Sequence, residues 1–248
     1  TVMMSVVYCS SARPRVPTRV TVGLSWSGPT RVRAAVMGTP ERRTIRYQLV
    51  SSGSGGRTGE EPDTLLAPGT ARALLAALRD GRVATGAAGQ VVFHLAEGTD
   101  LPIEVVRPIG VEQSNSSLVV DDRWILKVFR RVQRGTNPEL EVLRHLADRG
   151  AANVPHLAGW YELRSEAGDG TLGVLTALVP DAVDGWEWRL AQLPWRADET
   201  IGPLHRLGAV VASLHRSLAE GEDEASSDGF GIVAGGPRLA RSIAEGVA

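Results

Sequence analysis

The chain has 248 residues, of which 43% are hydrophobic and 22% charged, a balance that is ordinary for a folded globular protein and excludes global disorder. Its formal net charge of -1 provides no overall field for holding nucleic acid or an anionic membrane, so any recognition of phosphate must be local. A single cysteine, Cys9, excludes an internal disulfide framework and fits a reducing compartment.

No apolar run approaches the roughly 18 residues that a transmembrane helix needs. The first residues include a short apolar run but no basic residue before it, which argues against a secretory signal. We therefore expect a cytoplasmic protein whose partners are small molecules and include neither nucleic acid nor a membrane. The sequence does not predict an oligomeric state.

The N-terminal part carries the weakest pattern, because short β-like runs in residues 1–45 are broken by Gly, Pro and Arg. A strand is predicted over residues 44–50 and a flexible loop over residues 51–63. A helix is predicted over residues 70–80, with leucines at helical spacing and Gly81 as its stop. We interpret residues 1–88 as an N-terminal cap domain.

From Gly89 the pattern turns to strands, over residues 90–95 and 103–107. A hairpin follows, in which a polar tip separates two apolar, β-branched runs. In its return strand the period of two places Lys127 on one face with two apolar neighbours and puts the remaining apolar side chains on the other. The residues of the predicted tip are Glu112, Gln113, Ser114, Asn115, Ser116 and Ser117.

Lys127 requires a partner, because burying an ammonium group without one costs more than a neutral hydrogen bond returns. A helix is predicted to begin after Gly135, with Asn137 as its N-cap, Pro138 at its first position and acidic residues in its first turn. Glu141, at the edge of the apolar stripe of this helix, is the predicted partner. The alternative is that Lys127 and Glu141 form only a surface ion pair.

Three predicted features are typical of the phosphate-binding site in kinase-like folds. They are a hairpin tip rich in hydroxyl and main-chain N–H donors, a lysine on the next strand and a glutamate on the following helix. The runs EQSNSSLVV, WILKVFRR and GTNPELEV, followed by Asp184-Gly185-Trp186 and RLGAVVASLHRSLAE, also occur in this order in a known family. On these runs the chain resembles the actinobacterial maltokinases, which are aminoglycoside-phosphotransferase-like kinases. The resemblance covers residues 46–220.

The resemblance implies a bilobal, protein-kinase-like α/β fold. Residues 89–179 would form the small lobe, and residues 180–248 the beginning of a helical lobe. It also implies an enzyme of carbohydrate metabolism that uses ATP and Mg²⁺ to convert maltose to maltose 1-phosphate. The hinge between the lobes would bind the adenine edge through the backbone of Ala177, Leu178 and Val179. The nucleotide phosphates would contact the tip from Gln113 to Ser117, together with Lys127 and Glu141.

Residues 181–248 contain no H-G-D or H-R-D catalytic loop and no D-F-G or D-F-E metal motif. Asp228-Gly229-Phe230-Gly231 has a scrambled order and is predicted to be a turn. We therefore assign no catalytic residue and no metal ligand to this chain and expect it to be inactive by itself. A kinase acting on glucosamine is an alternative, and a non-catalytic nucleotide-binding regulatory module is an alternative of another class.

Overall fold

The structure, a computed structural model, describes residues 2–9, 19–25, 31–37, 45–52, 65–86, 89–112, 115–192 and 201–219. In residues 2–52 it describes the backbone only, apart from the side chain of Gln48. The chain divides into two compact units. Unit 1 comprises Thr1–Leu143 and Pro155–Pro180, and unit 2 comprises Arg144–Val154 and Asp181–Ala248.

Unit 1 is built on one sheet, whose strands within the described residues run in the order β1-β4-β3-β2-β5-β6-β11-β12-β9-β8-β7, with β10 beside β4. Neighbouring strands pair antiparallel. The strands are β1 (Val2–Cys9), β2 (Arg19–Ser25), β3 (Arg31–Met37), β4 (Ile45–Ser52), β5 (Val83–Gly86), β6 (Gly89–Leu95), β7 (Val106–Glu112), β8 (Asn115–Val120), β9 (Trp124–Phe129), β10 (Arg131–Val132), β11 (Leu157–Arg164) and β12 (Gly170–Ala177).

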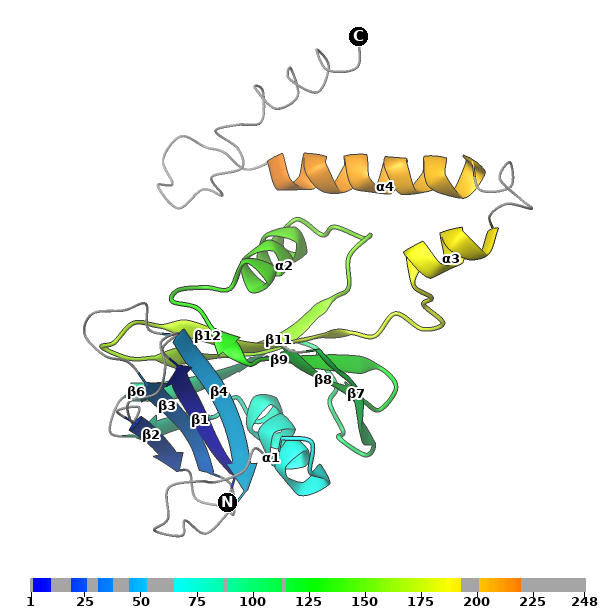
Figure 1. The fold of residues 1–248 in the computed structure, drawn as a ribbon. Coiled ribbons are helices and arrows are strands. Elements are labelled where there is room, and N and C mark those ends of the chain that lie inside the picture. Colours follow the sequence, from blue (N-terminus) through cyan, green and yellow to red (C-terminus); the bar gives the residue numbers. More distant parts are fainter. Residues whose placement is uncertain are drawn as a thin grey trace. The chain divides into compact units, whose positions relative to one another are not determined.

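One face of this sheet packs against helix α1 (Pro68–Arg79), which contacts β4, β6, β7 and β11 (Figure 1). The predicted leucine stripe of this helix is confirmed, because Leu74, Leu75 and Leu78 are at most 1% exposed. Leu126 and Val128 of β9 join the same core. Since buried and half-buried residues alternate from Trp124 to Val128, the predicted division of β9 into two faces is also confirmed.

The opposite face packs against the first half of helix α2 (Pro138–Asp148). Leu140 is fully buried there in a small cluster with Phe129, Leu157 and Val174. The predicted N-cap is confirmed, because the side-chain oxygen of Asn137 accepts the N–H of Glu139 at 2.9 Å. The N–H of Asn137 in turn donates to the hydroxyl of Thr171 on β12 at 2.9 Å, which fixes the start of α2 on the sheet.

A buried glutamine joins β4 to the strands at the centre of the sheet. Gln48 is fully buried, and with its amide oxygen turned toward Tyr161 it accepts the phenol O–H at 2.7 Å. Its amide nitrogen then donates to the main-chain oxygens of Leu172 and Phe129 at 2.9 and 3.2 Å. One side chain thus satisfies polar groups on β9, β11 and β12, which are distant from it in the sequence.

The predicted strand over residues 103–107 is wrong in its start, because β7 begins only at Val106. The carboxylate of Asp121 accepts the N–H groups of Ile103, Glu104 and Val105 at 2.6 to 2.9 Å. Ile103 also has a φ of 66°, a value that a strand does not allow. A side chain after β8 therefore satisfies the backbone groups that a neighbouring strand would otherwise pair.

Unit 2 contains α3 (Gly185–Gln192) and α4 (Ile201–Ala219) in its described part. His145, which also belongs to this unit, contacts the main-chain oxygen of Ser217 in α4 at 3.2 Å. None of the described helices combines the length and the apolar character that a membrane crossing requires.

Candidate functional site

The candidate site lies on the face of the sheet that carries α2. Lys127 occupies the middle of β9, and its Nζ lies 2.8 Å from Oε2 of Glu139 in the first turn of α2. The Lys127 side chain is 30% exposed, so its ammonium group is paired and still accessible to a ligand. The same Nζ lies 5.9 Å from the centre of the Phe129 ring. The arrangement therefore presents an oriented positive charge at the surface of the sheet.

The structure corrects the predicted partner of Lys127, which was Glu141. Side chains two residues apart on a helix point about 200° apart, so Glu139 and Glu141 lie on opposite sides of Leu140. Leu143, which packs against the same cluster, lies on the Glu139 side of Leu140, so the apolar stripe is nearer to Glu139 than to Glu141. With Leu140 packed on Phe129, α2 lies so that Glu139 contacts Lys127. Glu141 forms no ion pair with Lys127. Its role in nucleotide binding stays a prediction.

The predicted hairpin tip is shorter than expected. Asn115, Ser116 and Ser117 belong to β8 and pair with β9, so they are strand residues and not loop residues. Ser117 lies directly opposite Lys127 on the same face, an arrangement that places their Cβ atoms about 5 Å apart. Gln113 and Ser114, also predicted to contact phosphate, lie outside the described residues.

Ser116 points to the other face. It lies opposite Val128 of the core against α1 and is 2% exposed. Its hydroxyl accepts the Nε–H of Arg130 at 2.9 Å. The hydroxyl of Ser116 is therefore unavailable to a phosphate beside Lys127. This corrects the prediction that Ser116 contacts the nucleotide phosphates.

Two of the three predicted hinge residues use their N–H groups within unit 1. Ala177 donates to the main-chain oxygen of His156 and Leu178 to that of Arg123, both at 2.8 Å. Within the described part of the chain, no hydrogen bond is formed by the N–H of Val179, and its side chain is 54% exposed. Of the three, Val179 is the residue whose N–H is best placed to donate to a ligand.

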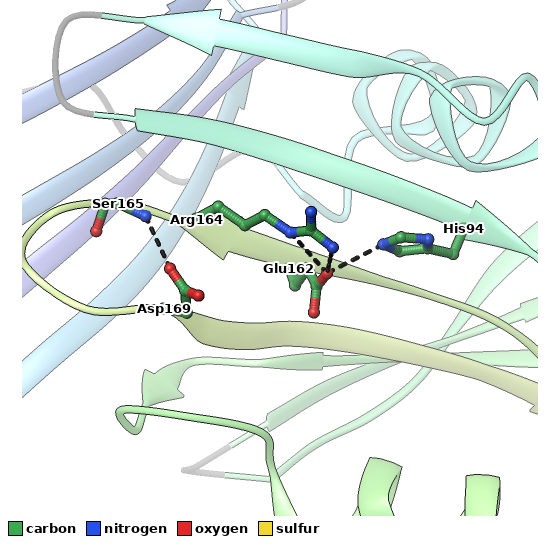
Figure 2. A network of polar contacts seen from close by, with 5 residues as sticks. All are labelled: His94, Glu162, Arg164, Ser165 and Asp169. Atoms are coloured by element: carbon green, nitrogen blue, oxygen red, sulfur yellow. Dashed lines mark hydrogen bonds and ion pairs between the residues drawn. The ribbon is translucent and has the colours of Figure 1, made fainter.

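A second polar cluster lies farther along the same face of the sheet. Oε1 of Glu162 contacts His94 at 3.1 Å and accepts from two nitrogens of Arg164 at 3.1 and 2.8 Å, as Figure 2 shows. His94 also stacks on Trp160, with ring centres 4.7 Å apart. Because Trp160 packs against the cluster under α2, we interpret this polar cluster as support for the helix.

No group of three or more His, Cys, Asp or Glu side chains that could hold a metal ion is found among the described residues. We assign Mg²⁺ to none of them.

Sequence reasoning missed two residues of this site. Glu139 could have been considered from its place in the first turn of the helix, next to Glu141. No sequence pattern predicts the role of Arg130. Its contact with Ser116 depends on the pairing of β8 with β9 and not on the periodicity of one strand.

Comparison with known proteins adds a family model and a set of relatives. The model of the phosphotransferase enzyme family matches residues 105–231, slightly more than half of the chain. A glucosamine kinase of Streptacidiphilus jiangxiensis is 30% identical over 212 residues, which are 81% of this chain and 46% of that protein. A glucosamine kinase of Mycolicibacterium smegmatis is 31% identical over 121 residues, 46% of this chain and 30% of that protein.

Solved structures show the same likeness. A glucosamine kinase in complex with glucosamine, ADP and inorganic phosphate is 26% identical with a TM-score of 0.54, and the match covers 84% of this chain and 48% of that chain. A glucosamine kinase in crystal form A gives 26% identity and a TM-score of 0.50, over 75% of this chain and 42% of that chain. The predicted kinase-like α/β fold is thereby confirmed, and the chain spans about half the length of these relatives or less.

Proposed function

Because the chain belongs to the phosphotransferase enzyme family, we propose that it forms the nucleotide-binding part of an ATP-dependent sugar kinase with glucosamine as its acceptor. The observation that carries this proposal is the ion pair between Lys127 and Glu139 on an accessible face of the sheet. A lysine held in this way on a strand by a glutamate of the next helix is the arrangement that kinases use for nucleotide phosphates.

Each side chain has a separate role in the proposed phosphate-binding site. The ammonium group of Lys127 attracts the phosphate oxygens as a compact point charge, and Glu139 holds it in one direction. Asn137 and Thr171 fix the helix start that carries Glu139. Ser117, opposite Lys127 on β8, supplies a hydroxyl donor at the same place. Positioning and charge are what phosphoryl transfer requires of these residues.

The adenine ring would lie where β12 ends. The N–H of Val179 is the donor that this segment offers, since those of Ala177 and Leu178 are already used. A bound Mg²⁺ would supply positive charge that offsets the negative charge of the phosphates during transfer.

Glucosamine is proposed ahead of maltose, which the sequence analysis placed first. The support is that the relatives named above, in sequence and in structure, are glucosamine kinases. Maltose remains the second candidate because of the runs that resemble maltokinases, and a non-catalytic regulatory module remains the candidate of another class.

A coupled ADP-release assay on the full-length gene product tests the proposal. We expect ATP-dependent turnover with glucosamine and a smaller rate or none with maltose. A preference for maltose would reverse the order of the acceptors. Absence of turnover with every sugar, together with measurable ADP binding, would favour the regulatory module.

A further inference from the structure

Arg130 links the described end of β8 to the central strands of the sheet, away from the ion pair. It follows the last residue of β9, and its main-chain oxygen accepts the N–H of Gln48 at 2.7 Å. Gln48 is itself held by Tyr161. The backbone of Arg130 is thereby anchored to Gln48 of β4, which lies 82 residues earlier in the sequence.

The side chain of Arg130 extends from this anchor to β8. Its Nε donates to the hydroxyl of Ser116 at 2.9 Å, and Ser116 is only 2% exposed. A hydrogen bond made by a charged donor to a buried hydroxyl is stronger than a neutral one, and leaving that hydroxyl without its partner is unfavourable. The contact therefore favours one position of β8 against β9.

Ser117 is the next residue along β8 and points to the opposite face, where it lies across from Lys127. A shift of β8 that releases Ser116 would also move Ser117 away from Lys127. Because successive side chains of a strand alternate between faces, Arg130 can act on the Lys127 face only through the backbone.

We propose that Arg130 is a positioning residue for nucleotide phosphates: through Ser116 it fixes β8 so that the hydroxyl of Ser117 lies beside the ammonium group of Lys127. This inference rests on the proposed function, since it assumes that phosphates bind at Lys127. It assigns different roles to adjacent serines, with Ser117 contacting the ligand and Ser116 holding the strand.

The test compares ADP with adenosine in calorimetric titrations of the full-length gene product and its variants. We expect R130Q and S116A each to lower the affinity for ADP about tenfold, and the double variant to lower it about tenfold as well, because the two residues act through one contact. The affinity for adenosine, which has no phosphate, stays unchanged. R131Q is the matched control, since it removes an exposed arginine charge from the next position and leaves ADP affinity as it was.

An equal loss of ADP and adenosine affinity in R130Q, additive losses in the double variant, or unchanged ADP affinity in S116A would each overturn the proposal. If R130Q fails to fold, S116A, which removes only a hydroxyl, carries the same expectation. If the unmodified protein binds no ADP, the proposed function fails, and amide hydrogen exchange decides the positioning role. Exchange in β8 must accelerate in R130Q and S116A but not in R131Q, and unchanged exchange in the first two contradicts that role.

Discussion

At the scale of single residues, the ion pair of Lys127 and Glu139 serves orientation more than stability. Their side chains are 30% and 38% exposed, and pairs at such exposure contribute at most about 1 kcal/mol. The ion pair instead fixes the orientation of the Lys127 ammonium group before a ligand binds.

Replacing Glu139 by Gln should therefore impair nucleotide use without unfolding the protein. We expect E139Q to lower kcat/KM for ATP at least tenfold, because the lysine loses its charged partner, and to change the free energy of unfolding by less than about 1 kcal/mol. E141Q makes the same chemical change in the same helical turn, and it should lower kcat/KM less than E139Q does, because the carboxylate that pairs with Lys127 is that of Glu139. Steady-state kinetics and urea unfolding of both variants decide this, and a loss confined to E141Q would restore the pairing that the sequence predicted.

Gln48 attaches β4 to β9, β11 and β12 through its side chain. The change Gln48→Leu keeps a similar volume but leaves the Tyr161 hydroxyl and two main-chain oxygens without their partner. Unsatisfied buried groups of this kind cost about 1 to 3 kcal/mol each. We expect Q48L to lower the free energy of unfolding by about 2 kcal/mol or more, measured by urea denaturation.

The variant Y161F provides the matched comparison for Q48L. If the two side chains stabilise the fold through their mutual hydrogen bond, the double variant is less destabilised than the sum of the single ones. Additive losses would show that Gln48 acts mainly through the oxygens of Leu172 and Phe129.

At the scale of elements, the pairing of β11, β12 and β9 depends on the absence of one side chain. Gly173 lies between Tyr161 and Val128 in the sheet. A Cβ at Gly173 would lie 2.4 Å from a ring carbon of Tyr161 and 2.7 Å from the main-chain oxygen of Lys127. The aromatic ring thus occupies the space above the glycine, and β12 can approach both neighbours only because that space is left.

The change Gly173→Ala should therefore destabilise unit 1 by about 1 to 3 kcal/mol or more, as overpacking in a core does. Gly208→Ala in α4 is the control, because a Cβ there meets no atom within 4 Å and alanine favours a helix by about 1 kcal/mol. Urea unfolding followed by tryptophan fluorescence should show a lower midpoint for G173A. An unchanged midpoint in G173A would contradict this account of the sheet.

At the scale of the whole molecule, the described residues include the Lys127–Glu139 pair, which we propose contacts nucleotide phosphates, and no group of three or more His, Cys, Asp or Glu side chains that could hold a metal ion. The sequence also contains neither a catalytic-loop motif nor a metal motif after the hinge. Since phosphoryl transfer depends on a positioned base and on metal-held phosphates, the 248-residue chain is expected to bind nucleotide weakly and to transfer no phosphate.

An ADP-release assay of the 248-residue chain beside the full-length gene product measures this. We expect no release above background from the chain with glucosamine or maltose, and unchanged weak ADP binding when Mg²⁺ is removed. Turnover by the chain itself would show that its catalytic residues were overlooked.

The sequence by itself determined the elements and the faces that they present. The period of two in β9 predicted that Lys127 and Phe129 share one face, and the N-cap signal at Asn137 predicted where α2 begins. These features depend on neighbours within one element, so a local pattern is sufficient to predict them.

Only the tertiary structure decided which side chains meet. Glu139 and Glu141 both lie in the first turn of α2, and only the packing of this helix on the sheet brought Glu139 to Lys127. Likewise, the register of β8 on β9 put Ser117 beside Lys127 and buried Ser116. The physical reason is that helix orientation and strand register are set by contacts between residues distant in the sequence, as Gln48 and Tyr161 are, and the period of one element carries no information about them.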